Sequence, residues 1–122
     1  MSDWDDSKPI YLQLRQVVAQ QILRGLMQEG EAVPSVRQVA AEEKINPLTV
    51  SKAYQLLVDE NLLEKRRGLG MFVTEGAQVL ALEQERKQFI EQEWPKILER
   101  MEALELDPTQ LPQPQIGQGD SA

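Results

Sequence analysis

The chain has 122 residues, and its 13 Lys/Arg against 20 Asp/Glu give a net charge of −7. It has no cysteine and no histidine, which excludes disulfides, zinc fingers, cysteine or histidine nucleophiles and imidazole metal ligands. No apolar run approaches the roughly 18 residues of a membrane span, and the acidic residues 1–6 are unlike a secretory signal. We therefore predict a cytoplasmic location, with no membrane, metal or cofactor partner.

The charge is unevenly distributed. Residues 8–75 hold nine Lys/Arg and eight Asp/Glu, a net charge of +1, while residues 1–7 carry −3 and residues 76–122 carry −5. A DNA duplex responds to the potential of one protein face rather than to the total charge, so the acidic segments do not exclude DNA binding. Near neutrality also fits an ordinary globular domain, and charge alone does not choose between the two.

The first predicted helix runs from about Pro9 to about Arg24. Proline suits the first turn because its fixed φ matches a helix and its missing N–H would have no partner there. Apolar residues then recur at helical spacing, and Gly25 and Gly30 follow them as stop signals. The apolar stripe consists of Ile10, Leu14, Val17 and Ile22, widened by Leu12 and Val18.

Two further helix starts follow, separated by a short turn. Ser35 is a favoured N-cap, and Gln38 three residues later completes a capping-box pattern, so a second helix begins here and ends near Lys44. Asn46 is among the best N-caps and Pro47 is the preferred first-turn residue, so a third helix begins at Pro47. A helix pair with this spacing predicts a helix-turn-helix, although an ordinary helix pair has similar signals.

The third helix ends near Glu60, because Asn61 tolerates the left-handed conformation that stops a helix. Its predicted inner stripe consists of Val50, Ala53, Tyr54, Leu57 and Val58. Its predicted outer face presents Thr49, Ser51, Lys52 and Gln55. Small polar residues followed by a lysine suit a recognition helix, whose first turns face base edges and phosphates.

A basic hairpin follows the helix pair. Residues 62–66 and 71–74 have the pattern of two short strands, and the turn Arg67–Gly70 has glycines where the backbone must reverse. Arg66 and Arg67 have two interpretations: charges that keep an edge strand from aggregating, or a wing that contacts the DNA backbone or minor groove. We favour the wing, and Gly76 marks the end of this domain.

Residues 78–106 return to a helical pattern. Apolar residues at Ile90, Trp94, Ile97, Met101 and Leu104 are spaced by 4, 3, 4 and 3, as in a coiled coil. Pro95 should either kink this helix or split it in two. The seam either packs on its own domain or pairs with a second subunit. We favour pairing, because so short a chain has little else to cover it.

Residues 8–75 resemble the GntR family of bacterial transcription regulators. The family pattern Leu-Pro-Ser-x-Arg-x-Leu-Ala corresponds to residues 33–40, and Val-Asn-Pro-x-Thr-Val-x-Lys-Ala-Tyr corresponds to residues 45–54. The wing pattern Arg-x-Gly-x-Gly-x-Phe-Val corresponds to residues 66–73, and the opening residues 9–14 also match. Leu69 and Met71 replace residues that are often basic and threonine in the family, which weakens the expected wing contact.

The short C-terminal part resembles that of the YtrA subfamily. This resemblance implies a tail that chiefly dimerises, and a repressor of operons that often include membrane transporter genes of the ABC type. It also implies DNA contacts from Arg37, Thr49, Ser51, Lys52 and the wing around Arg67 and Gly68. Pro95 is a departure that puts a straight dimer helix in question.

The sequence thus predicts a mainly α fold with a small β-hairpin, a winged helix-turn-helix with C-terminal dimerisation helices. The expected segments are the DNA-binding domain at residues 8–75, the helical tail at 77–107 and disorder at 108–122. We predict a homodimeric repressor of a palindromic operator in double-stranded DNA, with no enzymatic activity and an unknown effector. The alternative is a protein–protein adaptor.

Two sets of residues carry these expectations. The predicted DNA contacts are Arg37, Asn46, Leu48, Thr49, Ser51, Lys52, Gln55, Arg66, Arg67, Gly68 and Gly70. The predicted dimer contacts are Leu82, Phe89, Ile90, Trp94, Ile97, Met101 and Leu104. No catalytic or metal-binding residue is expected.

Overall fold

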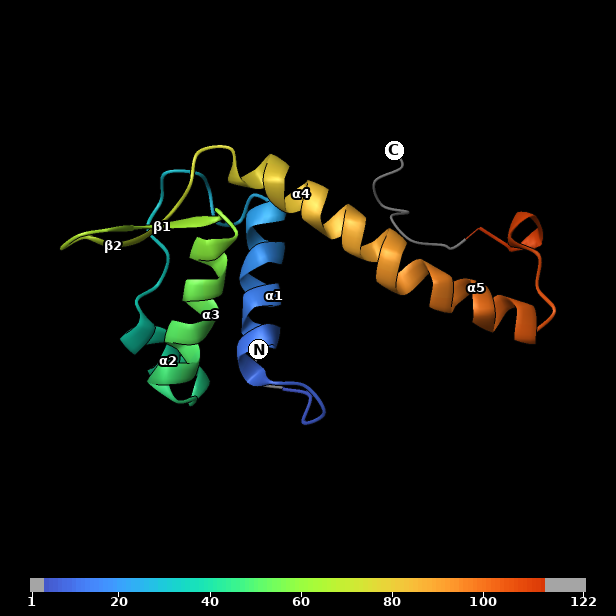
Figure 1. Cartoon of the computed structure of the whole chain (residues 1–122), viewed down its shortest axis with the longest axis horizontal. Helices are drawn as coiled ribbons and strands as arrows, with labels where there is room; N and C mark the ends of the chain where they lie inside the picture. Colours follow the sequence, from blue (N-terminus) through green and yellow to red (C-terminus); the bar gives the residue numbers. More distant parts are fainter. Residues whose placement is uncertain (1–3, 114–122) are drawn as a thin grey trace. The chain divides into compact units, whose positions relative to one another are not determined.

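The computed structural model describes residues 4–113, and the chain divides into two compact units, Met1–Glu85 and Arg86–Ala122. The first unit contains three helices, a hairpin and the start of a fourth helix (Figure 1). The elements are α1 (Ile10–Leu23), α2 (Val36–Glu43), α3 (Pro47–Asp59), β1 (Leu63–Arg66), β2 (Gly70–Val73), α4 (Ala77–Gln88) and α5 (Trp94–Ala103). The predicted fold class, mainly α with a small β-hairpin, is confirmed.

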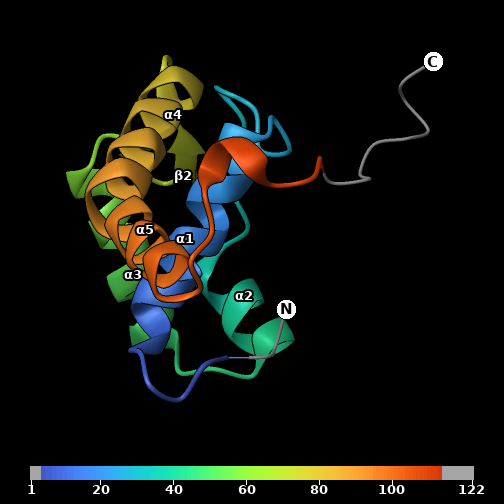
Figure 2. The ribbon, with the colours of Figure 1, turned by 90° about the vertical axis from the view of Figure 1, so that its right-hand side faces the viewer.

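Helices α1 and α3 lie side by side, with their N-termini at the same end of the unit (Figure 1). Helix α2 packs against α3 and lies toward that same end of the unit (Figure 1 and Figure 2). No residue of α2 is fully buried, and it packs through the half-buried side chains of Val36, Val39 and Ala40. The short α2 is therefore held mainly by one face, as expected for the first helix of a helix-turn-helix.

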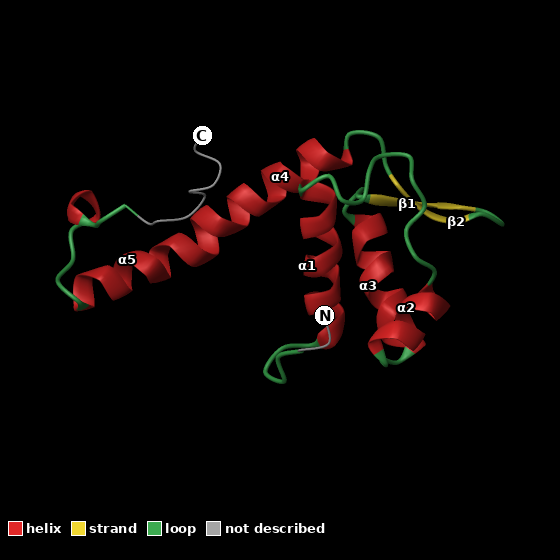
Figure 3. Ribbon diagram, turned by 180° about the vertical axis from the view of Figure 1, so that it is seen from behind, coloured by secondary structure: helices red, strands yellow, loops and turns green. Residues whose placement is uncertain are grey.

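The two strands form an antiparallel hairpin in which Leu63 pairs with Val73 and Arg66 pairs with Gly70 (Figure 3). The segment before α2 extends this hairpin, because Ala32 bridges to Phe72 and the Val33 N–H donates to the Met71 carbonyl at 2.9 Å. This third edge was not predicted from the sequence. So short a pairing has no periodicity of its own, and it depends on where the hairpin folds back.

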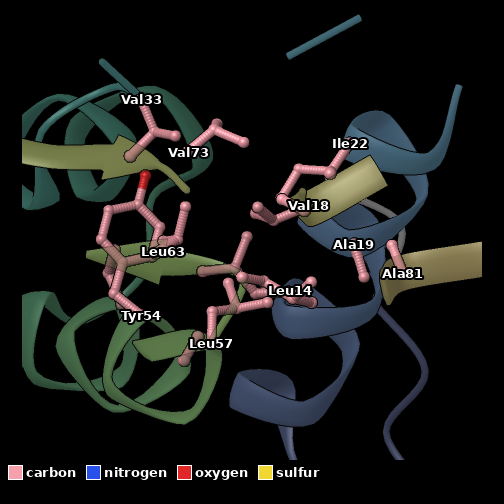
Figure 4. Packing of buried hydrophobic residues seen from close by; sticks show 14 residues of the cluster. Leu14, Val18, Ala19, Ile22, Val33, Tyr54, Leu57, Leu63, Val73 and Ala81 are labelled. Carbon is pink, nitrogen blue, oxygen red and sulfur yellow. The ribbon is translucent and has the colours of Figure 1, made fainter. Parts of the chain in front are cut away.

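The core joins α1, α3, the hairpin and the start of α4 (Figure 4). Tyr54 is 1% exposed, and its hydroxyl donates to the Pro34 carbonyl at 2.6 Å. Burial raises the pKa of Tyr54 to about 12, so the hydroxyl keeps the proton that it donates. This bond ties the middle of α3 to the segment that leads into α2. The fully buried residues of α1 and α3 include Ala19, Ile22, Val50, Ala53 and Leu57.

Local capping fixes the helix boundaries close to the predicted ones. The Ser35 hydroxyl accepts from the Gln38 N–H at 3.0 Å, as an N-cap should. The Gln38 side chain, however, donates to Glu42 at 3.2 Å, so the reciprocal half of the predicted capping box is replaced by an i to i+4 pair. Asn61 has φ of +65°, which agrees with its predicted role as a left-handed stop.

The region around Pro95 is one helical run with a π-helical turn. Residues Phe89–Glu93 form that turn between α4 and α5, and the Trp94 N–H donates to the Phe89 carbonyl, five residues earlier. Proline has no N–H and its ring crowds the carbonyl four residues back, and the wider turn relieves this conflict. The kink or break predicted at Pro95 is thus replaced by a π-helical turn, which is wider than an α-helical turn. No helix within residues 4–113 is long and apolar enough to cross a membrane.

The chain beyond α5 contains one short capped turn. Disorder was expected from residue 108, but Pro108–Gln110 form a single 3-10 turn. The Asp107 side chain caps it by accepting from the Thr109 N–H at 3.0 Å and from the Thr109 hydroxyl at 2.8 Å. These two bonds stabilise the ionised carboxylate and lower the pKa of Asp107. Residues 111–113 follow without regular secondary structure, and the remainder of that prediction, residues 114–122, lies outside the described residues.

A polar cluster attaches the start of α4 to the first unit. The Arg15 guanidinium contacts Glu60 at 2.8 Å and Glu85 at 3.5 Å, and it donates to Gln84 at 3.1 Å. The Arg15 side chain is only 12% exposed. Nearby, Glu29 accepts from the N–H groups of Gly76 and Gln78 and so caps the first turn of α4. The first turns of α4 are therefore part of the first unit.

Replacing Arg15 with leucine should lower the free energy of unfolding by about 1–3 kcal/mol, because two half-buried carboxylates lose their cation. The matched control is Arg66→Leu, whose ion pair with Glu64 is exposed on both sides and should cost less than about 1 kcal/mol. Urea denaturation followed by circular dichroism measures both. Equal losses in the two variants would contradict the structural role of the Arg15 cluster.

Candidate nucleic-acid interface

The exposed side of α3 carries the central part of the candidate interface. Ser51, Lys52 and Gln55 are exposed, whereas Val50, Ala53 and Tyr54 between them are at most 1% exposed. The Leu48 side chain is 76% exposed at the first turn. Thr49 is half-buried, so of the predicted contacts on α3 it is the least accessible. Gln55 donates to Asp59 at 2.9 Å along the same face.

The N-terminal end of α3 is built by Asn46. Its side-chain oxygen accepts from the Leu48 N–H at 2.8 Å, and its backbone carbonyl accepts from the Thr49 N–H at 2.9 Å. The side-chain oxygen of Asn46 is therefore engaged in the cap, and only the side-chain NH2 group is left to donate to another partner. The capped helix end also concentrates the positive end of the helix dipole, which favours an anion nearby.

Two cations lie close to this helix end without a carboxylate partner among the described residues. The Lys52 ammonium lies 4.0 Å from the centre of the Tyr11 ring. Arg37 is exposed in the first turn of α2, and no ion pair within residues 4–113 involves it. Among the described residues, no ion-paired carboxylate therefore neutralises either cation.

The two wing arginines differ in their surroundings. The Arg66 guanidinium is 2.8 Å from Glu64 and 4.1 Å from the centre of the Phe72 ring. It therefore lies along the hairpin, and the Glu64 carboxylate partly neutralises its charge. Arg67 is exposed in the turn and makes no ion pair among the residues that the structure describes. Gly68 and Gly70 both have positive φ, which lets the chain reverse here as predicted. Arg67 is thus the better-presented cation of the wing.

A groove of about 380 Å³ lies between α3 and the hairpin. Its walls include Ser35 at the start of α2, Ser51 and Gln55 on α3, and Lys65 and Gly70 on the hairpin. The fold therefore brings three separate motifs of the sequence together around one groove, whose lining also includes the apolar side chains of Val33, Leu69 and Met71. Lys65 lines this groove and Tyr11 contacts Lys52, but neither was predicted as a site residue. The run of three charged residues in β1, Glu64–Arg66, could have indicated Lys65, whereas no local signal pairs Tyr11 with Lys52.

The predicted dimer residues show a mixed exposure. Leu82 in the first unit is 39% exposed, and Phe89, Ile90, Trp94, Ile97 and Leu104 are 37–61% exposed. Phe89 and Trp94 stack with their ring centres 6.4 Å apart. Met101 differs from the others, because it is only 9% exposed and is covered within the single chain. Leu98 in α5 is also 38% exposed but was not predicted.

Comparison with known proteins agrees with this geometry. The family model described as "Bacterial regulatory proteins, gntR family" matches residues 10–73, from the start of α1 to the end of β2. The chain is 42% identical over 77 residues to the "HTH-type transcriptional repressor YtrA" of Bacillus subtilis. That alignment covers 63% of this chain and 59% of the relative, less than two thirds of its length.

Two solved structures are also similar. A "GntR family transcriptional regulator from Listeria monocytogenes" has a TM-score of 0.72 and 28% identity, covering 87% of this chain and 91% of that chain. The AraR DNA-binding domain, solved in complex with operator ORE1, has a TM-score of 0.53 and 25% identity, covering 55% and 82%. The relatives' names describe transcription regulators, and on that ground the prediction of a non-enzymatic protein is confirmed.

The capping geometry yields a stability prediction. Asn46→Ala removes the acceptor of the Leu48 N–H and should lower the free energy of unfolding by about 1 kcal/mol. Asn46→Asp keeps an oxygen at the same place and should unfold close to the wild-type urea midpoint. An alanine variant as stable as the wild type would show that the cap contributes nothing.

Proposed function

This chain belongs to the gntR family of bacterial regulatory proteins, and we propose that it acts as a homodimeric repressor of a palindromic operator. Each subunit would place α3 in the major groove of one half-site and its wing on the adjacent backbone or minor groove. The observation that carries this proposal is the alternation along α3, where Ser51, Lys52 and Gln55 are exposed between fully buried neighbours.

We assign different roles to the residues of this surface. Lys52 and Arg67 would contact phosphates, because each presents a cation that no described carboxylate neutralises. Arg37 has the guanidinium geometry for a guanine edge or a phosphate. Thr49, Ser51 and Gln55 would contact bases or phosphates, with Asn46 and Leu48 at the helix start. Gly68 and Gly70 would let the wing backbone approach the duplex, and Arg66 would contribute only part of its charge.

The dimer would form through the apolar residues of the tail. Phe89, Ile90, Trp94 and Ile97 are all more than a third exposed, and a water-exposed apolar surface of this kind favours association. A two-fold pair also suits a palindromic site, because the symmetry of the protein then mirrors that of the DNA. Leu82 and Leu104 would extend the contact, whereas Met101 would support it from within the chain.

The regulated genes follow only from resemblance. The similarity to a repressor named YtrA supports repression. We propose that this repression occurs in the cytoplasm, by occupation of a promoter. The subfamily resemblance supports a target operon with membrane transporter genes of the ABC type. The experiment that tests the whole proposal is selection of bound genomic fragments by the purified protein, with excess unrelated duplex as competitor. Enrichment of one palindromic site is the expected result, and its neighbouring genes identify the operon.

The double variant Arg37→Ala/Lys52→Ala should weaken binding to the selected operator at least about 100-fold, because it removes two surface cations. Lys52→Ala alone should reduce the dependence of log Kobs on log salt by about 0.9 if it meets one phosphate. Fluorescence anisotropy over a salt series measures both quantities. The control is Arg24→Ala, an exposed cation at the opposite end of α1, which should bind like the wild type. Wild-type affinity in the double variant would refute the assignment.

The dimer has its own test. Trp94→Asp or Ile97→Asp would place a carboxylate in the apolar contact and should convert the protein to a species of 13.9 kDa, the mass of one chain. Light scattering after size-exclusion chromatography measures the mass, and circular dichroism checks that the helices persist. Gln92→Asp changes an exposed polar residue of the same segment and should leave the dimer intact. A wild-type protein that is already monomeric would overturn the dimer proposal.

A further inference from the structure

One aromatic ring near the DNA-facing surface has no part in the assignments above. Tyr11 lies in the first turn of α1, 41 residues before Lys52 in the chain, and its ring is partly buried against the core. The Lys52 ammonium lies over the face of this ring, 4.0 Å from its centre. A cation this close to a ring face is attracted by the negative electron density of that face. We propose that Tyr11 is a positioning residue, which holds the Lys52 ammonium in place for a DNA phosphate.

The choice of a neutral ring has a physical consequence. A carboxylate partner would also fix the lysine, but it would cancel the charge that a phosphate needs. The arginines that form ion pairs among residues 4–85 show this alternative, because Arg15 and Arg66 are each paired with glutamate. The Tyr11 ring restrains the Lys52 ammonium without neutralising its positive charge. The ammonium can present N–H donors to a phosphate on the side away from the ring.

The restraint matters because a lysine side chain is flexible. Four rotatable bonds separate the Lys52 ammonium from α3, and fixing them on binding costs conformational entropy. A ring that already confines the ammonium in the free protein reduces this loss. Tyr11 is itself fixed, because α1 packs along α3 and the ring contacts the core. The packing of α1 on α3 therefore prepares a DNA contact on α3.

The first test needs no DNA. A proton above an aromatic ring is shielded, so the ε-methylene protons of Lys52 should resonate upfield of those of the other lysines. Lys52→Gln assigns the signal by removing it. Tyr11→Phe keeps the ring and should retain the upfield shift, whereas Tyr11→Leu should abolish it. An unshifted Lys52 signal in the wild type would overturn the inference, whether or not an operator is found.

The second test is a double-mutant cycle on the selected operator, and it rests on the proposed DNA-binding role of Lys52. Tyr11→Leu should weaken binding about two- to fivefold, as an exposed cation–π contact predicts. Tyr11→Phe should bind like the wild type. In the Lys52→Gln background, Tyr11→Leu should have no further effect, because no cation remains to be positioned. Urea midpoints of the same variants show whether folding is retained.

The outcomes separate the two proposals. A Tyr11→Leu loss that persists in the Lys52→Gln background would mean that the tyrosine acts by itself, and the positioning role would be wrong. A Tyr11→Phe loss equal to that of Tyr11→Leu would assign the effect to the hydroxyl and would also overturn it. If Lys52→Gln leaves operator affinity and salt dependence unchanged, the proposed role of Lys52 fails instead, and the shielded signal still reports whether the ring–cation contact exists.

Discussion

The rotation of α3 about its own axis is the constraint on which the candidate interface depends. Val50, Ala53, Tyr54 and Leu57 are at most 1% exposed, and together they fix which side of the helix faces the core. A shift by one residue turns an α-helix by about 100°, which would bury polar side chains such as Lys52 and expose apolar ones. The outer residues are presented because the inner residues leave no other orientation. The Tyr54 bond to Pro34 extends this constraint to the approach to α2.

The same fold explains how an acidic chain leaves cations exposed near the candidate interface. Arg15 serves the structure, since it is nearly buried between carboxylates of α3 and α4. Arg66 lies against the hairpin and shares its charge with Glu64. Arg37, Lys52 and Arg67 remain as exposed cations without a carboxylate partner among residues 4–113, and they belong to α2, α3 and the wing. The net charge of −7 is a property of the whole chain and does not describe the charge of this face.

Sequence reasoning succeeded where the controlling interactions are local. The N-caps Ser35 and Asn46 act on N–H groups two or three residues away, so the helix starts could be predicted from short patterns. It succeeded less well at Pro95, where the conflict was recognised but its solution, a π-helical turn, depends on how neighbouring turns adjust. Met101 was predicted as a dimer contact, and how little of its side chain is exposed in the single chain, 9%, could not be read from its spacing.

By itself the sequence determined the order of helices and strands, the buried stripe of α3, and the residue types available for binding. These features could be predicted because periodicity and capping depend on residues only a few positions apart. Only the tertiary structure decided which partners those residues have. The Arg15–Glu60 contact spans 45 residues and the Tyr11–Lys52 contact spans 41, and the Ala32 bridge forms where the hairpin folds back. Contacts between distant segments depend on how helices pack in space, and that geometry leaves no repeating pattern in either segment.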